Sequence, residues 1–301
     1  MKSIALSLIL ATSLLASGNS EALEKTLSEP QVSETVLTDD ELMNRVIYTN
    51  LIGAGFVTLW GVAFWDYFTI SPQFHNEGWF EEDTKYGGAD KMGHMYSTYL
   101  WSLGFGSLYE YWGMEQGEAA IYGSLTSWTF QAIMEVGDSF SASQGFSYED
   151  MIANTVGALF YVVREHYPSL KEKIDMRAEF APNFDPGVDP FTQYNSMKYL
   201  LALKFNGFDS MKHNFMKYGE LHLGYYTRGY QNVDAYERKE RIVYAAIGIN
   251  LSQIVGETGW EKTAKTFNYI QLPYTYVPVG YDFNSEEYVA PYSRPYFGTR
   301  K

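Results

Sequence analysis

Residues 46–65 read VIYTNLIGAGFVTLWGVAFW, a run of 20 residues without a charge. This length meets the requirement of about 20 apolar residues for a helix that crosses a bilayer. Three further apolar segments follow at residues 92–109, 119–134 and 151–163. Their lengths and their lack of strict alternation favour helices over strands. We therefore expect a compact unit of about four apolar helices at residues 46–167, either soluble or lying in or against a membrane.

The segment before this unit has the features of an export signal. In residues 1–22, Lys2 precedes an apolar run that ends in small residues, which is typical of a cleavable signal peptide. Residues 23–45 are polar and acidic, and we expect a flexible leader that ends at a helix start. Thr38 is the expected N-cap, with Glu41 completing a capping box. The sequence thus predicts an exported protein of the periplasm, associated with the inner or outer membrane.

The chain changes character after residues 168–195, a proline-rich stretch that we interpret as a linker. Residues 197–206, MKYLLALKFN, then alternate with the period of two that is typical of a strand. Strands are expected at residues 197–206, 219–230, 241–255 and 267–279. The predicted fold class is α+β, a helical unit followed by an antiparallel sheet of about four long strands in residues 196–301. The sheet either packs one face on the helices or forms outer-membrane hairpins.

The composition excludes several classes of function. The formal net charge is −14, from 36 acidic and 22 basic residues, so nucleic acid is not an expected partner. The chain has no Cys, which excludes a disulfide, a thiolate metal site and a Cys nucleophile. A lipid anchor on Cys is excluded as well, so we expect membrane attachment through the apolar segments or the strands. Aromatic residues make up 17% of the chain, which suits a membrane interface or a sugar-binding cleft.

Ionisable residues recur at helical spacing in the apolar segments. Asp90 and His94 are four residues apart, Glu135 and Asp138 are three apart, and Asp150 leads a further polar face. Because an unpaired buried charge is costly, we expect these faces to converge. The hypothetical metal ligands are Asp90, His94, Glu135, Asp138, Asp150 and Asn154. Such an oxygen-rich set favours a divalent cation such as Mg²⁺, Ca²⁺ or Mn²⁺.

A catalytic interpretation of the same residues is also open. His94 would act as a general base or as a nucleophile toward phosphorus, and Lys91 would neutralise a phosphate. The hypothetical catalytic residues are His94, Asp90, Lys91 and Glu135. The sequence contains no Gly-x-Ser-x-Gly elbow, no His-Glu-x-x-His helix and no Gly-rich phosphate loop, so no known hydrolase chemistry is indicated.

Each of these residues also has a purely structural explanation. Ser147 and Asp150 have the spacing of a capping box. Asp90 is a candidate cap of the second helix, and Gly157 would allow close approach of two helices. Glu135, like Asp138, would be solvated at a helix end.

The ordered motifs resemble a known family. Asp-Lys-x-x-His at residues 90–94, Glu135, and Gly-Phe-Ser-x-x-Asp-x-x-x-Asn-x-x-Gly at residues 145–157 resemble the YfiM-like family of predicted periplasmic lipoproteins, a domain of unknown function. The motif order is also similar to that of the VanZ-like membrane proteins linked to glycopeptide resistance. The resemblance covers about residues 46–165 and implies an envelope location and a helical unit, but no reaction. Its matching positions are Asp90, Lys91, His94, Glu135, Asp150 and Asn154.

Two functions follow as hypotheses. The first is a membrane-associated envelope protein of unknown activity, with a structural or ligand-binding role centred on the polar cluster. The alternative is a metal-dependent or His-based hydrolase or phosphotransferase that acts on a lipid or glycan precursor. The expected partner is a membrane surface or an envelope lipid or glycan, and the expected cofactor, if one is used, is a divalent metal.

Overall fold

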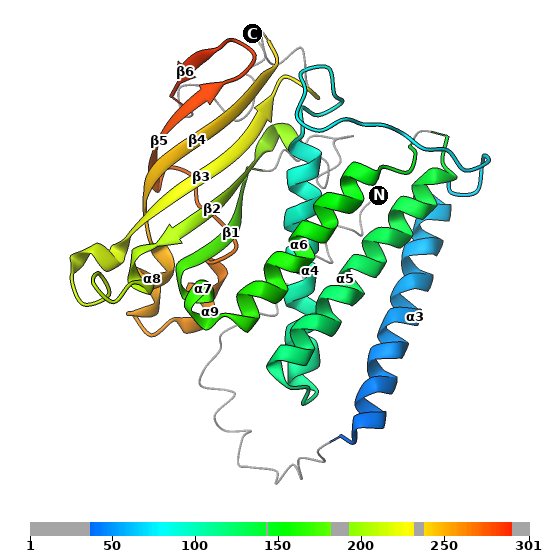
Figure 1. The fold of residues 1–301 in the computed structure, drawn as a ribbon, viewed down its shortest axis with the longest axis horizontal. Coiled ribbons are helices and arrows are strands. Elements are labelled where there is room, and N and C mark those ends of the chain that lie inside the picture. Colours follow the sequence, from blue (N-terminus) through cyan, green and yellow to red (C-terminus); the bar gives the residue numbers. More distant parts are fainter. Residues whose placement is uncertain (1–36, 143, 182–192, 232–237, 291–301) are drawn as a thin grey trace, which may run out of the picture.

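The structure is a computed structural model that describes residues 37–142, 144–181, 193–231 and 238–290. The expected signal peptide, most of the acidic leader and residues 182–192 of the proline-rich stretch lie outside the described residues. Helices come first along the chain and an antiparallel sheet follows (Figure 1), which confirms the α+β class.

Four long helices form the first layer. They are α3 (Asp39–Phe64), α4 (Ala89–Tyr111), α5 (Gln116–Ser139) and α6 (Tyr148–His166). Each predicted apolar segment falls within one of them, apart from Trp65, which is the C-cap of α3. Helix α3 begins as expected, because the Glu41 N–H donates to Thr38 Oγ1 at 3.3 Å and the Thr38 N–H donates to Glu41 Oε2 at 2.9 Å. Helix α4 packs on both α5 and α6, while α3 packs on α5.

The close packing of α4 and α6 depends on a glycine. A Cβ atom added to Gly157 of α6 would overlap the carbonyl oxygen of Met95 in α4. Only glycine fits such a contact between two backbones. The expectation that Gly157 permits close helix approach is therefore confirmed.

The sheet has six antiparallel strands in chain order, two more than expected. They are β1 (Ile174–Phe180), β2 (Met197–Lys204), β3 (Gly219–Arg228), β4 (Glu240–Ile249), β5 (Tyr276–Asp282) and β6 (Glu287–Val289). Strand β1 and helix α7 (Pro168–Lys173) lie in the stretch interpreted as a linker, and in this respect the interpretation was wrong. Three of the prolines in that stretch, Pro182, Pro186 and Pro190, follow β1 in the sequence and so do not interrupt it.

Two other strand predictions were too long. The strand expected at residues 241–255 ends at Ile249, because the Asn250 side chain accepts the Gln253 N–H at 3.1 Å and starts α8 (Leu251–Gly256). The strand expected at residues 267–279 begins only at Tyr276, after α9 (Glu261–Thr266) and an irregular segment. Short 3₁₀ turns complete the described elements: η1 (Tyr194–Ser196), η2 (Phe205–Gly207) and η3 (Phe215–Tyr218).

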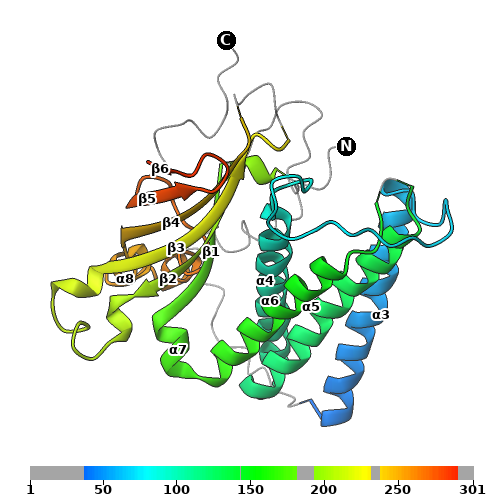
Figure 2. The same cartoon turned by 45° about the horizontal axis from the view of Figure 1, so that its top comes forward.

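The sheet packs on the helical unit near β1 (Figures 1 and 2). Met176 of β1 joins the cluster of buried residues around Tyr99 and Tyr161 of the helices. The Arg164 guanidinium of α6 lies 2.7 Å from an Asp175 carboxylate oxygen. These contacts agree with a sheet that packs one face on the helices. On that face Tyr199 of β2 lies beside Tyr96 of α4, and the Tyr225 hydroxyl of β3 donates to the Gly87 carbonyl. The rest of the face exposes large apolar side chains.

Candidate functional site

The polar cluster forms at one end of the helical unit. Helices α4, α5 and α6 run alternately up and down, so the start of α4, the end of α5 and the start of α6 meet at the same end (Figure 1). The chain between α3 and α4 crosses this end (Figure 2). This arrangement brings together polar residues that are separated by about 60 positions in the sequence.

Lys91 lies at the centre of one half of the cluster. Its Nζ atom is 2.6 Å from Glu77 Oε2, 2.7 Å from Asp90 Oδ2 and 2.9 Å from Asp150 Oδ1. The side chain of Lys91 is almost completely buried. A single ammonium group therefore faces three carboxylates. Glu77 was absent from the predicted set, because it lies in an irregular loop without any periodicity that could have indicated its direction.

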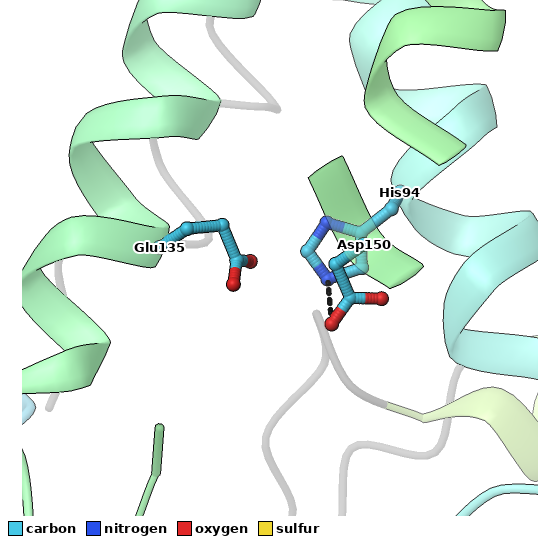
Figure 3. A group of neighbouring side chains, drawn as sticks. All are labelled: His94, Glu135 and Asp150. Carbon is cyan, nitrogen blue, oxygen red and sulfur yellow. Dashed lines mark ion pairs between the residues drawn. The ribbon is translucent and has the colours of Figure 1, made fainter. Parts of the chain in front are cut away.

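The other half of the cluster consists of His94, Glu135 and Asp150 (Figure 3). His94 Nε2 lies 3.8 Å from Asp150 Oδ2. One potential ligand atom from each of the three residues lies within 4.8 Å of the others. Figure 3 shows the Glu135 carboxylate extending from α5 toward the other two side chains. One imidazole and two carboxylates at this separation fit the donor set of a divalent cation.

Capping explains only part of the role of Asp150. Its backbone N–H donates to Ser147 Oγ at 3.2 Å, so Ser147 caps α6 as expected. In a complete capping box the Asp150 carboxylate would accept the Ser147 N–H, but Glu135 Oε2 accepts it instead at 3.2 Å. The Asp150 carboxylate is therefore not used for capping and can contact Lys91 and His94.

Asp90 is not a helix cap. The N-cap of α4 is Gly88, with a φ of 84° and no side-chain hydrogen bond. Asp90 lies inside the first turn and pairs with Lys91. The alternative interpretation of Asp90 as the cap of this helix was therefore wrong.

Asp138 and Asn154 lie at the border of the cluster. Asp138 is beside the Tyr67 hydroxyl and interacts electrostatically with His94 and Asp150. Asn154 is one turn beyond Asp150, and its Oδ1 atom accepts the Thr98 hydroxyl at 2.7 Å. Among the described residues, Asn154 Nδ2 and His94 Nδ1 have no hydrogen-bond partner. Of the six predicted metal ligands, His94, Glu135 and Asp150 thus converge on one point, and Asp90 is engaged by Lys91.

The loop residues of the cluster have shifted pKa values. Burial by itself raises the pKa of Glu77, but the hydrogen bond and the charge of Lys91 outweigh burial and hold this pKa below its usual range. Burial and the neighbouring Asp138 raise the pKa of Tyr67 far above its usual range, so its hydroxyl stays protonated. Glu77 is therefore an anion at neutral pH and Tyr67 is a neutral hydrogen-bond donor.

An apolar cavity of about 250 Å³ borders the cluster. It lies between α3 and α5, and its lining includes Thr58, Tyr67, Trp128 and Gly137. The Tyr67 ring lines this cavity, while its hydroxyl donates to the Met134 carbonyl at 3.0 Å on the side of Asp138. The apolar cavity and the polar cluster are therefore joined through one side chain.

The fold and the cluster define an α+β protein with a buried acidic site at one end of its helical unit. Residues 76–166 match the family model described as "Predicted periplasmic lipoprotein (DUF2279)". The matched segment contains α4, α5 and α6 but neither α3 nor the sheet. It includes Glu77, Asp90, Lys91, His94, Glu135, Asp138, Asp150 and Asn154. The expected resemblance to the YfiM-like lipoproteins is thus confirmed for this segment, whereas the VanZ-like resemblance is not shown. No curated protein and no solved structure matches the chain.

The family description agrees with the expected periplasmic location, but it differs from our expectation about the lipid anchor. The word lipoprotein implies an anchor, which conflicts with the expectation that this chain has none. The 301 residues include no Cys to which a lipid could be attached. Attachment to the membrane without a lipid anchor stays a prediction.

Proposed function

We propose that this chain is a membrane-associated envelope protein that binds a divalent cation at the polar cluster. The observation that carries the proposal is an imbalance of charge. Five carboxylates, from Glu77, Asp90, Glu135, Asp138 and Asp150, surround one ammonium and one imidazole group. A buried carboxyl group is stable when it is paired, bound to a metal or protonated. Burial and the neighbouring Asp150 raise the pKa of Glu135 to about 9, so without a cation this carboxyl group is protonated. A cation held by His94, Glu135 and Asp150 would supply the missing positive charge.

The alternative of a purely structural cluster fits these contacts less well. A cluster that only holds helices in register needs its own charges to balance, because an uncompensated buried charge destabilises the fold. Lys91 already contacts Glu77, Asp90 and Asp150, so a purely structural cluster has to bury Glu135 without a cationic partner, as a protonated carboxyl group whose pKa burial has raised. Glu135 is 3% exposed, so water does not solvate it fully.

The polarity of the helical unit supports the membrane association. Among the described residues, one helix, α3, is long and apolar enough to cross a membrane by length and composition. Only 11% of its most apolar window is buried, and Ile52 and Leu59 are each 72% exposed. A core helix of a soluble protein would bury these side chains. In α4 and α5, polar residues such as Thr98 and Ser127 point inward, while Trp101 and Leu125 are exposed.

Metal binding by the full chain in detergent tests the site. After removal of metals with EDTA, we expect Mn²⁺ to bind at one site per chain, measured from the electron paramagnetic resonance signal of free Mn²⁺. Glu135→Gln and His94→Ala should each weaken binding by about tenfold or more. Glu118→Gln, which changes an exposed carboxylate on the same helix, is the matched control and should bind like the wild type. Equal Mn²⁺ affinity in all four proteins would refute the site.

A second candidate function is hydrolysis or phosphoryl transfer on a lipid or glycan precursor. The apolar cavity beside the cluster favours it, because an amphiphilic substrate needs an apolar surface next to a polar site. His94 lies beside Asp150, which would orient the imidazole as a general base. Release of inorganic phosphate from a short-chain phosphatidic acid tests this function. His94→Ala should abolish the release while the melting temperature stays within a few degrees of the wild type. The absence of phosphate release by the wild type would contradict this function. A large fall in the melting temperature of His94→Ala would instead assign a structural role to His94.

A further inference from the structure

The side chains of one face of the sheet are entirely apolar or aromatic over three rows that cross the strands. We call this the outer face. The first row consists of Ile174, Leu203, Leu221, Ile247 and Val277, which are cross-strand partners in the register. The second row consists of Met176, Leu201, Leu223, Ala245 and Val279. The third row consists of Ala178, Tyr199, Tyr225, Val243 and Tyr281. No charge interrupts these rows.

The opposite, inner face carries the charges of the same strands. Lys198 Nζ lies 3.1 Å from Glu179 Oε1, and Arg177 Nη1 lies 2.7 Å from Glu220 Oε1. Lys204 Nζ lies 3.0 Å from an Asp175 carboxylate oxygen. The acidic side chains among these residues are fully buried, and the basic ones nearly so. The inner face therefore combines dry, paired charges with a buried apolar cluster that includes Leu200, Ile242 and Tyr244.

This distribution is the reverse of that in a sheet exposed to water. A sheet with one wet face normally buries its apolar side and solvates its polar side. Here Leu223, Ile247 and Val277 of the outer face are 58%, 67% and 76% exposed. If water covered the outer face, the apolar side chains there would stay hydrated while the charged side chains of the inner face are dehydrated. Both effects oppose folding. With lipid on the outer face, the alternation becomes the favourable one, apolar outward and polar inward.

The backbone of this region is also suited to an apolar environment. Unpaired N–H and C=O groups are not tolerated in lipid. Strands β1 to β5 form a continuous ladder. The other edge of β1 is paired at Ala178, where the Ala178 N–H donates to the Tyr269 carbonyl at 3.1 Å and the Gln271 N–H donates to the Ala178 carbonyl at 3.0 Å.

The position of the outer face favours lipid over a protein partner. The exposed strands lie on the side of the molecule opposite α3 (Figure 1), and both sides expose apolar residues. One protein partner would cover only one side, whereas a bilayer surrounds both. The lengths agree, because strands β3 and β4 of 10 residues each extend about 33 Å against a hydrocarbon core of about 30 Å.

We propose that the exposed part of the outer face of β2–β5 contacts the acyl chains of a lipid bilayer, so that the sheet is a membrane element in addition to the helices. This exposed part consists of Leu201, Leu221, Leu223, Ile247, Val277 and Val279. This inference rests on the proposed membrane association and extends it to the strands. It concerns the surface that the strands present, and it is independent of the cation site.

Single cysteines test the proposal cleanly, since the chain has none of its own. Leu223→Cys and Ile247→Cys report on the outer face, Ile52→Cys reports on α3, and Ser210→Cys is the exposed loop control. The full chain is reconstituted in phosphatidylcholine vesicles and labelled with a water-soluble maleimide. In parallel, a bimane probe on each cysteine is tested for quenching by lipids brominated on the acyl chain. Val277→Cys replaces either strand variant if that variant fails to fold, as judged by near-ultraviolet circular dichroism.

We expect the strand cysteines to lose maleimide labelling relative to Ser210→Cys and to be quenched by brominated lipid. Labelling of the strand cysteines at the rate of Ser210→Cys, with Ile52→Cys protected, would overturn the inference while membrane association through α3 stands. Labelling of all sites would overturn both proposals. Protected strand cysteines without quenching would also overturn the inference, because a second copy of the chain would then cover the face.

Discussion

The two buried polar regions of this molecule handle the cost of burying charge in different ways. Beneath the sheet, Asp175, Glu179 and Glu220 each have a cationic partner within 3.1 Å, and four basic residues serve these three acids: Arg164, Arg177, Lys198 and Lys204. At the end of the helices, five carboxylates share one lysine and one histidine. The balanced region can hold its strands together unaided. In our proposal the unbalanced region binds a further cation, and for this reason the two regions should respond differently to the same change.

The same substitution in the two regions provides the strongest contrast. Glu220→Gln removes the anion opposite Arg177 and His222, so we expect the free energy of unfolding to fall by about 3–5 kcal/mol. Burial and the neighbouring Asp150 raise the pKa of Glu135 to about 9, so in EDTA Glu135→Gln replaces one neutral group by another and should cost less than about 1 kcal/mol. Urea unfolding in detergent, followed by tryptophan fluorescence, measures both. Equal losses would remove the distinction between the regions.

The lysine of the helical cluster should be replaceable by a metal ion. Lys91→Met leaves Glu77, Asp90 and Asp150 without their shared cation, and we expect a loss of about 3 kcal/mol in EDTA. Added Mn²⁺ should recover part of this loss, because a ligand that binds only the folded state stabilises it. The melting temperature with and without Mn²⁺ is the measurement. A loss that Mn²⁺ leaves unchanged would argue that the region does not accept a divalent cation.

Acidification should weaken the helical cluster through Glu77. The pKa of Glu77 is lower in the folded chain than its ordinary value, so its contribution to stability is present above the unfolded pKa. This contribution is lost as the pH falls through the lowered, folded pKa, because the proton neutralises the partner of Lys91. We expect the free energy of unfolding to fall less steeply from pH 6 to acid in Glu77→Gln than in the wild type, in EDTA. Parallel curves would show that Glu77 does not contribute.

The smallest expected effect is that of Ser147→Ala, which distinguishes helix capping from metal binding at the cluster. Ser147→Ala removes the side-chain cap of α6 and should cost about 1 kcal/mol. The backbone N–H that holds Glu135 remains in alanine, so Mn²⁺ affinity should stay as in the wild type. Urea unfolding and the Mn²⁺ titration are compared on the same protein. A clear fall in affinity would mean that the cap itself positions the metal ligands.

Much of the helical unit and its cluster could be predicted from local pattern. The apolar segments and the Thr38 cap depend on interactions within a few residues, and each is found where it was expected. The spacing of Asp90 and His94 also placed both on one helix face. Glu77 could not be found in this way, because a loop residue joins the cluster only through the path of the whole loop. Strand β1 was missed because its charged residues Asp175, Arg177 and Glu179 do not resemble a buried strand.

The sequence by itself determined where the helices lie and that the strands have one apolar and one polar face, because both are matters of local period. It could not determine which strand face is buried, since a period of two is the same whichever side is inside. Only the tertiary structure decided this, by collecting charges from β1, β2 and β3 into one paired network that stays dry beneath the sheet. The tertiary structure likewise decided which carboxylates of the helical cluster Lys91 contacts. This depends on three helix ends and one loop that meet at a single point.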